Sequence, residues 1–256
     1  MLRPLRALRE ALAELRHRPR LPLAFSAAAC ALHLLGWGLF AAGAGLSGAV
    51  PAALLRLLGV LVYAGSLIWL VEGLTRIALA ATGGSPPRWR ELCRWHGRIS
   101  RDVALGLLNS GLAMVAAALG GFMAWSLALV LMPALALPAA LLGLAAVVVV
   151  GLSQLFNACL VLDRGLSPSR AFTHGFQLLA RHWPALLGLT PLLGGILTLP
   201  FAAGLAAAAA SEGLGVVTTA AAMICALPVL ATTIGRAFRQ LEGPESPETP
   251  PLRGGR

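Results

Sequence analysis

The sequence predicts an all-α polytopic membrane protein with six transmembrane helices and two or three amphipathic helices at the membrane interface. Three observations lead to this class. Hydrophobic residues make up 58% of the 256 residues and charged residues only 12%, with a mean hydropathy of +0.81, whereas about 25% of residues are charged in soluble domains. The apolar residues fall into six long runs, and nearly all Arg residues lie in four blocks beside them. This composition excludes a water-soluble fold.

Hydropathy and interrupting residues place the six spans at about 21–46, 53–76, 103–132, 139–162, 184–208 and 214–235. Each run reaches the roughly 20 residues that a helix needs to cross the hydrocarbon. The third and fourth runs are separated only by the segment from Pro133 to Pro138. A single helix there would be far too long and would contain two prolines, so we expect a tight apolar hairpin.

Orientation follows from the distribution of arginine. With six spans, all four Arg blocks lie on one side of the membrane, and the opposite connections hold only Arg56. Cytoplasmic connections of membrane proteins are enriched in basic residues, so both termini are expected in the cytoplasm and the protein in the inner membrane. The four blocks are Arg3, Arg6, Arg9, Arg16, Arg18 and Arg20; Arg76, Arg88, Arg90, Arg94, Arg98 and Arg101; Arg164, Arg170 and Arg181; and Arg236, Arg239, Arg253 and Arg256.

The terminal segments are expected to be cytoplasmic. Residues 1–20 form an Arg-rich amphipathic segment in which Leu5, Leu8, Leu12 and Leu15 share one helical stripe, as in a helix lying in the headgroup plane. A secretory signal peptide is the alternative, but the apolar run that follows exceeds the usual 7 to 15 residues, so an uncleaved start is favoured. The Pro- and Gly-rich residues 237–256 are expected to be disordered.

Two cytoplasmic connections, at about 84–102 and 164–183, resemble each other and are called elbows below. Ser-Pro-x-Arg occurs in both, and in each the Ser is placed to cap a helix that begins with Pro. An apolar stripe follows each Ser-Pro pair, which predicts two interfacial helices. The similarity of the two elbows is explained either by duplication or by convergence. The elbow residues singled out are Ser85, Pro86, Arg88, Gly165, Ser167, Pro168, Arg170 and Trp183, and the stripes are Trp89, Leu92, His96, Ile99 and Val103, then Phe172, Phe176, Leu179 and Trp183.

The second elbow carries a family resemblance. Residues 162–183 read LDRGLSPSRAFTHGFQLLARHW, which resembles the Asp-x-Gly and Trp-containing run of bacterial six-span membrane domains. These include the membrane domain of some glycerophosphodiester phosphodiesterases and related uncharacterised families. The resemblance implies a helical module that accompanies other proteins, with Asp163 near the start of the interfacial helix, Gly165 in the turn and Trp183 at the headgroups. Gly175 stands where the family commonly has Ser, and no catalysis is carried over.

Polar residues inside the spans are the candidate functional groups. Glu72 and Arg76 are four residues apart, which favours an intrahelical ion pair. Their spacing also resembles the Glu-Glu-x-x-x-Arg motif of intramembrane prenyl-protein proteases, but Val71 replaces the first Glu. The remaining polar residues either line a pathway or make interhelical hydrogen bonds: Asn109, Gln154, Asn157, Thr190 and Thr198.

The sequence contains no pattern for a catalytic, metal or cofactor site. Four widely spaced cysteines form no C-x-x-C pair, and Cys30 with His33 lacks a second ligand pair. Because Arg lies beside apolar spans, anionic headgroups rather than nucleic acid are the expected counter-charge. We expect a non-enzymatic membrane module that holds a partner protein, or a second copy of itself, or that organises lipid. The alternative is a small transporter or exporter of an apolar or amphipathic molecule.

Overall fold

The computed structural model describes residues 2–82, 87–94 and 96–243. Every regular element in these ranges is helical, and six helical stretches are long and apolar enough to cross a membrane, which confirms the predicted fold class. The chain is therefore a multi-pass membrane protein. Its elements are α1 (Pro4–His17), α2 (Arg20–Ala44), α3 (Ala49–Ala80), α4 (Trp89–Leu92), α5 (Arg98–Leu131), the 3₁₀ turn η1 (Pro133–Leu135), α6 (Ala136–Gln154), α7 (Asn157–Arg164), α8 (Pro168–Ala208) and α9 (Glu212–Glu242).

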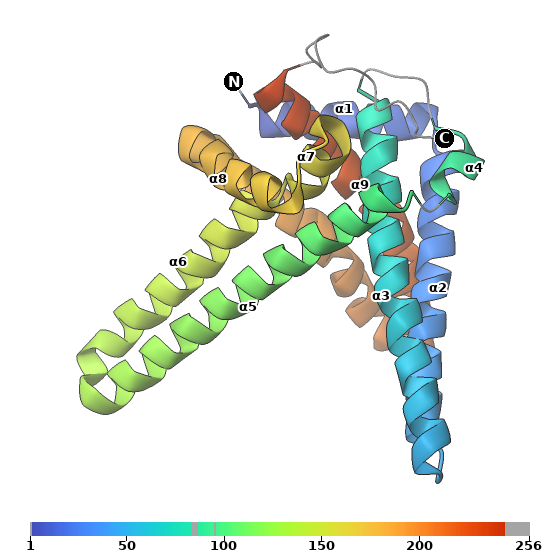
Figure 1. Cartoon of the computed structure of the whole chain (residues 1–256), viewed down its shortest axis with the longest axis horizontal. Helices are drawn as coiled ribbons and strands as arrows, with labels where there is room; N and C mark the ends of the chain where they lie inside the picture. Colours follow the sequence, from blue (N-terminus) through green and yellow to red (C-terminus); the bar gives the residue numbers. More distant parts are fainter. Residues whose placement is uncertain (1, 83–86, 95, 244–256) are drawn as a thin grey trace.

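Three helical hairpins, α2–α3, α5–α6 and α8–α9, meet at one end and diverge toward the other (Figure 1). The short helix α1 lies across the shared end, where α9 also ends. The hairpin turn between α5 and α6 falls at η1, where the two prolines predicted it. Because all connections with dense Arg lie at the shared end, we call this end the basic end of the molecule.

Glycine allows each hairpin to pack closely. A Cβ atom at Gly59 of α3 would lie 2.7 Å from the Gly36 carbonyl oxygen of α2, and one at Gly121 of α5 would lie 2.5 Å from Gly143 Cα of α6. The hairpin α8–α9 has the same kind of contact between Gly204 and Gly215. Small residues let helix backbones approach closely in membranes, so each hairpin is a tightly packed unit.

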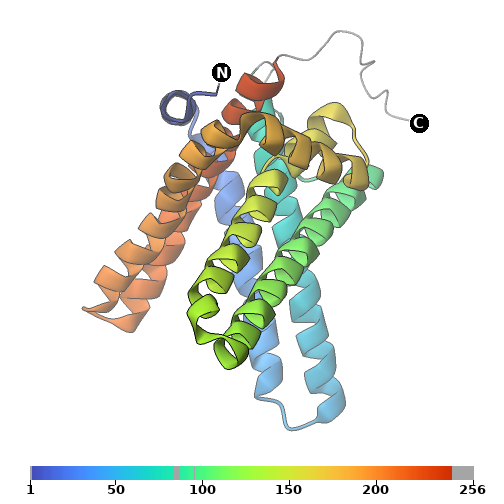
Figure 2. The same ribbon diagram turned by 90° about the vertical axis from the view of Figure 1, so that its left-hand side faces the viewer.

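The hydrophobic core lies toward the basic end. Its largest fully buried side chains include Phe25 of α2, Phe238 of α9, and Phe156 between α6 and α7. Toward the other end, large apolar side chains such as Leu57 and Val130 are exposed. In a bilayer these outer surfaces contact lipid, and the three hairpins are held together at the basic end (Figure 2).

The predicted fourth span, 139–162, lies within the apolar stretch Pro133–Arg164, which is long enough to cross a membrane but is divided into two helices. Helix α6 ends at Gln154 and α7 begins at Asn157, with Phe156 outside helical geometry at φ −100° and ψ 8°. Phe156 is fully buried beside Phe238 of α9, with ring centroids 5.9 Å apart. No Pro or Gly lies between Gln154 and Asn157, which explains why the sequence did not reveal the break.

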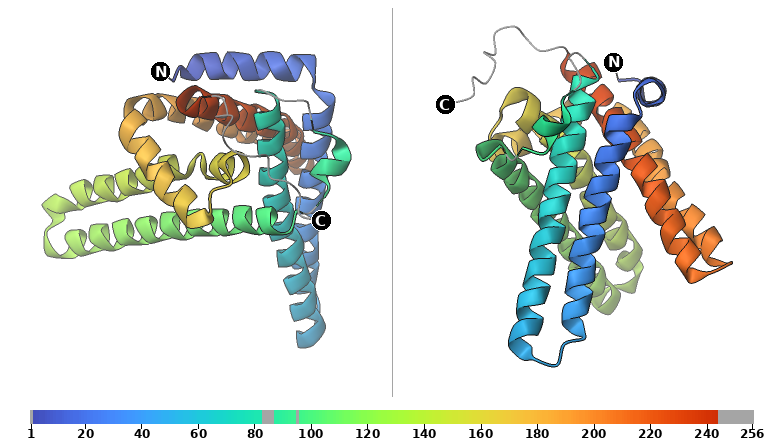
Figure 3. Two further views of the ribbon diagram at one scale, coloured as in Figure 1. Left: turned by 45° about the horizontal axis from the view of Figure 1, so that its top comes forward. Right: turned by 90° about the vertical axis from the view of Figure 1, so that its right-hand side faces the viewer.

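The second elbow is a helix, as predicted, and it is continuous with the fifth span in α8. Only His182 departs from helical geometry, at φ −129° and ψ 21°. Pro184 causes this bend, because proline removes a backbone donor and its ring clashes with the carbonyl four residues earlier. The first part of α8 consequently lies across the bundle before the helix turns down beside α9 (Figure 3).

The prediction of a long interfacial helix at the first elbow, about 84–102, is wrong. Helix α4 is a single turn, and α5 begins anew at Arg98 after Gly97, whose φ of +47° is a conformation that favours glycine. The backbone N–H of Arg88 donates to Glu91 Oε2 at 3.0 Å, which fixes the start of the turn. The predicted cap Ser85 and the predicted first helical residue Pro86 lie outside the described residues. The two elbows therefore differ in structure.

Two smaller expectations also need correction. Ser167 stands at the start of α8 with Pro168 as its first residue, but the Ser167 side chain makes no capping hydrogen bond. Gly165 ends α7 with φ of +61°, as a turn glycine should. Helix α9 continues to Glu242, beyond the predicted boundary at 236, and Ala237 and Phe238 are buried in its last turns.

Candidate functional site

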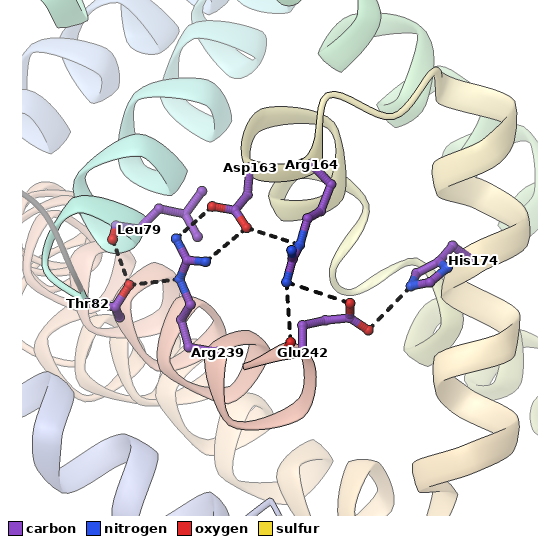
Figure 4. A network of polar contacts seen from close by, with 7 residues as sticks. All are labelled: Leu79, Thr82, Asp163, Arg164, His174, Arg239 and Glu242. Atoms are coloured by element: carbon purple, nitrogen blue, oxygen red, sulfur yellow. Dashed lines mark hydrogen bonds and ion pairs between the residues drawn. The ribbon is translucent and has the colours of Figure 1, made fainter. Parts of the chain in front are cut away.

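An ion-pair network joins α3, α7 and α9 at the basic end (Figure 4). Arg239 Nη1 and Nη2 donate to the two carboxylate oxygens of Asp163 at 3.0 and 2.6 Å. Arg239 Nε donates to Thr82 Oγ1 at 3.2 Å, and the Thr82 hydroxyl donates to the Leu79 carbonyl at 2.6 Å. A paired guanidinium and carboxylate form a strong polar contact in proteins, so this pair fixes α9 against α7, and the contact with Thr82 adds the end of α3.

The same network reaches α8. Arg164 Nε lies 3.5 Å from Asp163 Oδ2, and its Nη2 donates to the Glu242 carbonyl at 3.3 Å. His174 Nε2 lies 3.3 Å from Glu242 Oε1. Asp163 was expected near the start of the interfacial helix; it instead lies in the last turn of α7 and binds Arg239, 76 residues away in sequence. The sequence offered no signal for this partner.

Helix α1 is attached through Arg236. This side chain donates to the Ala81 carbonyl at 2.8 Å and lies 3.6 Å from Glu14 Oε2 of α1. The Arg3 backbone N–H donates to Gln240 Oε1 at 2.8 Å. Arg236 and Arg239 were counted as a topological signal, and the structure shows that they also hold helices together.

The predicted pair of Glu72 and Arg76 is present, with Arg76 Nη2 2.7 Å from Glu72 Oε1. His96, between α4 and α5, joins it: His96 Nδ1 lies 3.7 Å from Glu72 Oε1, and Nε2 lies 3.4 Å from Arg76 Nη1. Burial, with the positive charges of Arg76 and Arg94, lowers the pKa of His96 against the opposing effect of Glu72. The cluster ties the chain before α5 to α3.

A second polar cluster lies between α5, α6 and α7. Asn157 Nδ2 lies 3.0 Å from Ser110 Oγ and 3.1 Å from Gln154 Oε1, and Gln154 Nε2 donates to the Phe172 carbonyl of α8 at 3.3 Å. Gln154 and Asn157 therefore make the interhelical hydrogen bonds that were one of their two predicted roles. Asn109 does not join them, because it is exposed on the outer side of α5.

Gly175, where the resembling family commonly has Ser, lies against the α6 backbone. A Cβ atom there would collide with the Ser153 carbonyl oxygen. The Gly at this position is therefore explained by the close contact of α8 with α6, which a side chain would prevent.

The other predicted residues occupy the surface. Arg88 and Arg170 are exposed, and so is Trp183, next to the bend in α8. Thr198 is exposed and donates to the Gly195 carbonyl, whereas Thr190 is half-buried and donates to the Leu186 carbonyl, so neither points to a polar pathway. In the described part of the chain, no three His, Cys, Asp or Glu side chains are grouped as metal ligands.

An apolar pocket of about 180 Å³ lies where the hairpins meet. Helices α3, α5, α7 and α9 form its walls, together with the break between α6 and α7. The lining is mostly Leu, Val, Ile and Ala, and its polar members are Thr75, Gln154 and Asn157. No acidic or basic side chain lines it.

Comparison of the chain with models of protein families, with curated proteins and with solved structures found no match. The resemblance of residues 162–183 to the six-span membrane domains therefore stays a prediction. The fold by itself defines the class, which is a multi-pass integral membrane protein.

Proposed function

We propose that this protein is a non-enzymatic module of the inner membrane whose basic end binds and organises anionic lipid headgroups in the cytoplasmic leaflet. The observation that carries the proposal is the division of the arginines into two groups. Arg76, Arg164, Arg236 and Arg239 are half-buried and paired with acidic residues. In the other group the side chains are exposed, and Arg6, Arg98 and Arg101 among them also contact Glu10 or Asp102. This group consists of Arg3, Arg6, Arg9, Arg16, Arg18, Arg20, Arg88, Arg90, Arg94, Arg98, Arg101, Arg170 and Arg181.

Helix α1 places part of this exposed charge beside apolar side chains. Its small face, with Ala7 and Ala11, is fully buried against the rest of the protein. The neighbouring Leu5 and Leu12 are 65% and 48% exposed, and Arg9 and Arg16 are exposed next to them. Apolar side chains flanked by Arg suit a helix that lies in the interface of an anionic membrane.

The strength of the interaction can be estimated from the charge. Each Arg near an anionic surface contributes about 1 kcal/mol, which is about a fivefold change in affinity per side chain. Several exposed Arg side chains would therefore enrich anionic lipid around the basic end, and salt would weaken this enrichment.

The proposal is tested by counting retained lipids. Protein purified gently from vesicles of equal phosphatidylglycerol and phosphatidylcholine should retain mainly phosphatidylglycerol, as measured by native mass spectrometry. Combined Arg9→Gln, Arg16→Gln and Arg18→Gln substitutions should reduce that preference, while Arg56→Gln, an exposed Arg at the opposite end, should leave it unchanged. Equal retention of both lipids by the unaltered protein would refute the proposal, as would an equal effect of Arg56→Gln.

The proposal also requires the basic end to face the cytoplasm. A Cys introduced at Ser211, in the connection between α8 and α9, should react with an impermeant reagent added outside the cell, in a background without the four natural cysteines. Reaction from the cytoplasmic side alone would show that the orientation is reversed.

A small transporter of an apolar or amphipathic molecule is the second candidate, and the apolar pocket between the hairpins favours it. Vesicles containing the purified protein should then move a hydrophobic dye across the bilayer faster than empty vesicles. Identical rates would remove this candidate.

A further inference from the structure

The apolar pocket has a polar end. Thr75 of α3 lines it, is only 9% exposed, and its hydroxyl makes no hydrogen bond with any described residue. A hydroxyl without a hydrogen-bond partner in an apolar setting is unfavourable. Gln154, by contrast, uses both ends of its amide in the polar cluster with Ser110 and Phe172. Thr75 therefore offers a free hydrogen-bonding group inside an apolar pocket.

The ion-pair network lies between the pocket and the basic end. On each contributing helix, a network residue lies four to seven residues beyond a pocket residue: Thr82 beyond Thr75, Asp163 beyond Cys159, and Arg239 beyond Ile234. At about 1.5 Å per residue, the network lies roughly 6 to 10 Å above the pocket. The hairpins diverge on the side of the pocket away from the network (Figure 2), so a ligand from the bilayer is expected to approach from that side.

The pocket selects against charge. No acidic or basic side chain lines it, and an uncompensated charge in an apolar setting is strongly unfavourable. A small, uncharged polar end therefore matches the lining best.

The volume of the pocket suits an amphiphilic ligand better than a filling of water molecules. The cavity of about 180 Å³ slightly exceeds an engineered apolar cavity of about 150 Å³ that stays dry and binds benzene. An alkyl or isoprenoid chain matches Leu70, Leu107 and Leu227 on the walls, and a hydroxyl matches Thr75.

We propose that this pocket binds a neutral lipid with a free hydroxyl group, of the long-chain alcohol class, whose hydroxyl pairs with Thr75 Oγ1 and whose chain lies between the hairpins. This site is separate from the anionic headgroups proposed for the exposed Arg side chains. The two proposals can fail independently, because the variants that test them are at opposite sides of the ion-pair network.

The test uses dodecanol that carries a photoreactive diazirine on its chain, added to the protein in phosphatidylcholine nanodiscs. Peptide mapping should find the label on pocket residues of α3, α7 and α9. Unlabelled dodecanol should compete about fivefold better than the methyl ether or the alkane of equal chain length, because one hydrogen bond contributes about that factor. Equal competition by all three compounds would overturn the role of the hydroxyl.

Two variants test the site itself. Thr75→Val should remove the preference for alcohol over ether while keeping the pocket, and Ala158→Phe should abolish labelling by filling it. Matched controls are Thr198→Val, an exposed Thr in another span, and Ala116→Phe, an exposed Ala on α5. The proposal would be overturned if Ala158→Phe were labelled as strongly as the unaltered protein. It would also be overturned if the pocket residues of the unaltered protein carried no label.

Discussion

Replacing Arg239 by Leu should destabilise the protein severely. Arg239 and Asp163 share two hydrogen bonds of 3.0 and 2.6 Å, and their side chains are only 19% and 5% exposed. Removing one partner of a buried pair costs about 3–5 kcal/mol, because the other charge stays buried. Arg164 Nε remains 3.5 Å from Asp163, so we expect the lower value of about 3 kcal/mol, or roughly a hundredfold in the unfolding equilibrium.

The assay is unfolding in mixed detergent micelles as the fraction of denaturing detergent rises, followed by Trp fluorescence. Combining Arg239→Leu with Asp163→Asn should restore at least half of the loss, since both charges then disappear. The control is Arg98→Gln. The Arg98 side chain is 87% exposed, and its Nε lies 3.8 Å from Asp102 Oδ2. Losing this exposed pair should cost under about 1 kcal/mol. The reasoning is refuted if Arg239→Leu lowers the free energy of unfolding no more than Arg98→Gln does. It is also refuted if the double variant loses as much stability as the sum of the losses of Arg239→Leu and Asp163→Asn.

Three further predictions concern other contacts. Glu72→Gln and Arg76→Leu should each lower thermal stability more than the double substitution does. A double variant that melts at a lower temperature than either single variant would argue against a structural pair. Gly143→Val should cost about 1–3 kcal/mol by forcing the α5–α6 hairpin apart, whereas Gly120→Val, which has open space around it, should be neutral in the same melting assay. Because the pKa of His96 is lowered in the folded protein, stability should fall as pH drops below about 6.5 toward the folded pKa. His96→Gln should remove that part of the pH profile, and an unchanged profile would contradict the assignment.

The predictable part of this fold is the part governed by hydropathy. Six apolar runs and the side preference of Arg predicted the helices and their common basic end, and the two prolines after α5 predicted the hairpin turn at η1. The spacing of Glu72 and Arg76 predicted their contact, because neighbours on one helix face are fixed by helical geometry.

The remaining contacts depend on tertiary packing, which local sequence patterns do not predict. Asp163 meets Arg239 only because α7 and α9 converge, and the break at Phe156 arises where this ring packs on Phe238. The first elbow failed as a helix prediction because its apolar periodicity continues through Gly97, whereas the backbone there turns. Periodicity reports which faces are apolar and does not report where a backbone changes direction.

The divergence of the hairpins gives the two leaflets unequal roles. In the leaflet at the basic end, the helices pack on one another through Phe25, Phe156 and Phe238. In the opposite leaflet, each hairpin is a separate pair of helices packed through glycine and surrounded by lipid. We therefore expect changes in acyl-chain length or order in that opposite leaflet to act on the angle between the hairpins. Changes in the leaflet at the basic end act instead on the junction that holds the three hairpins together.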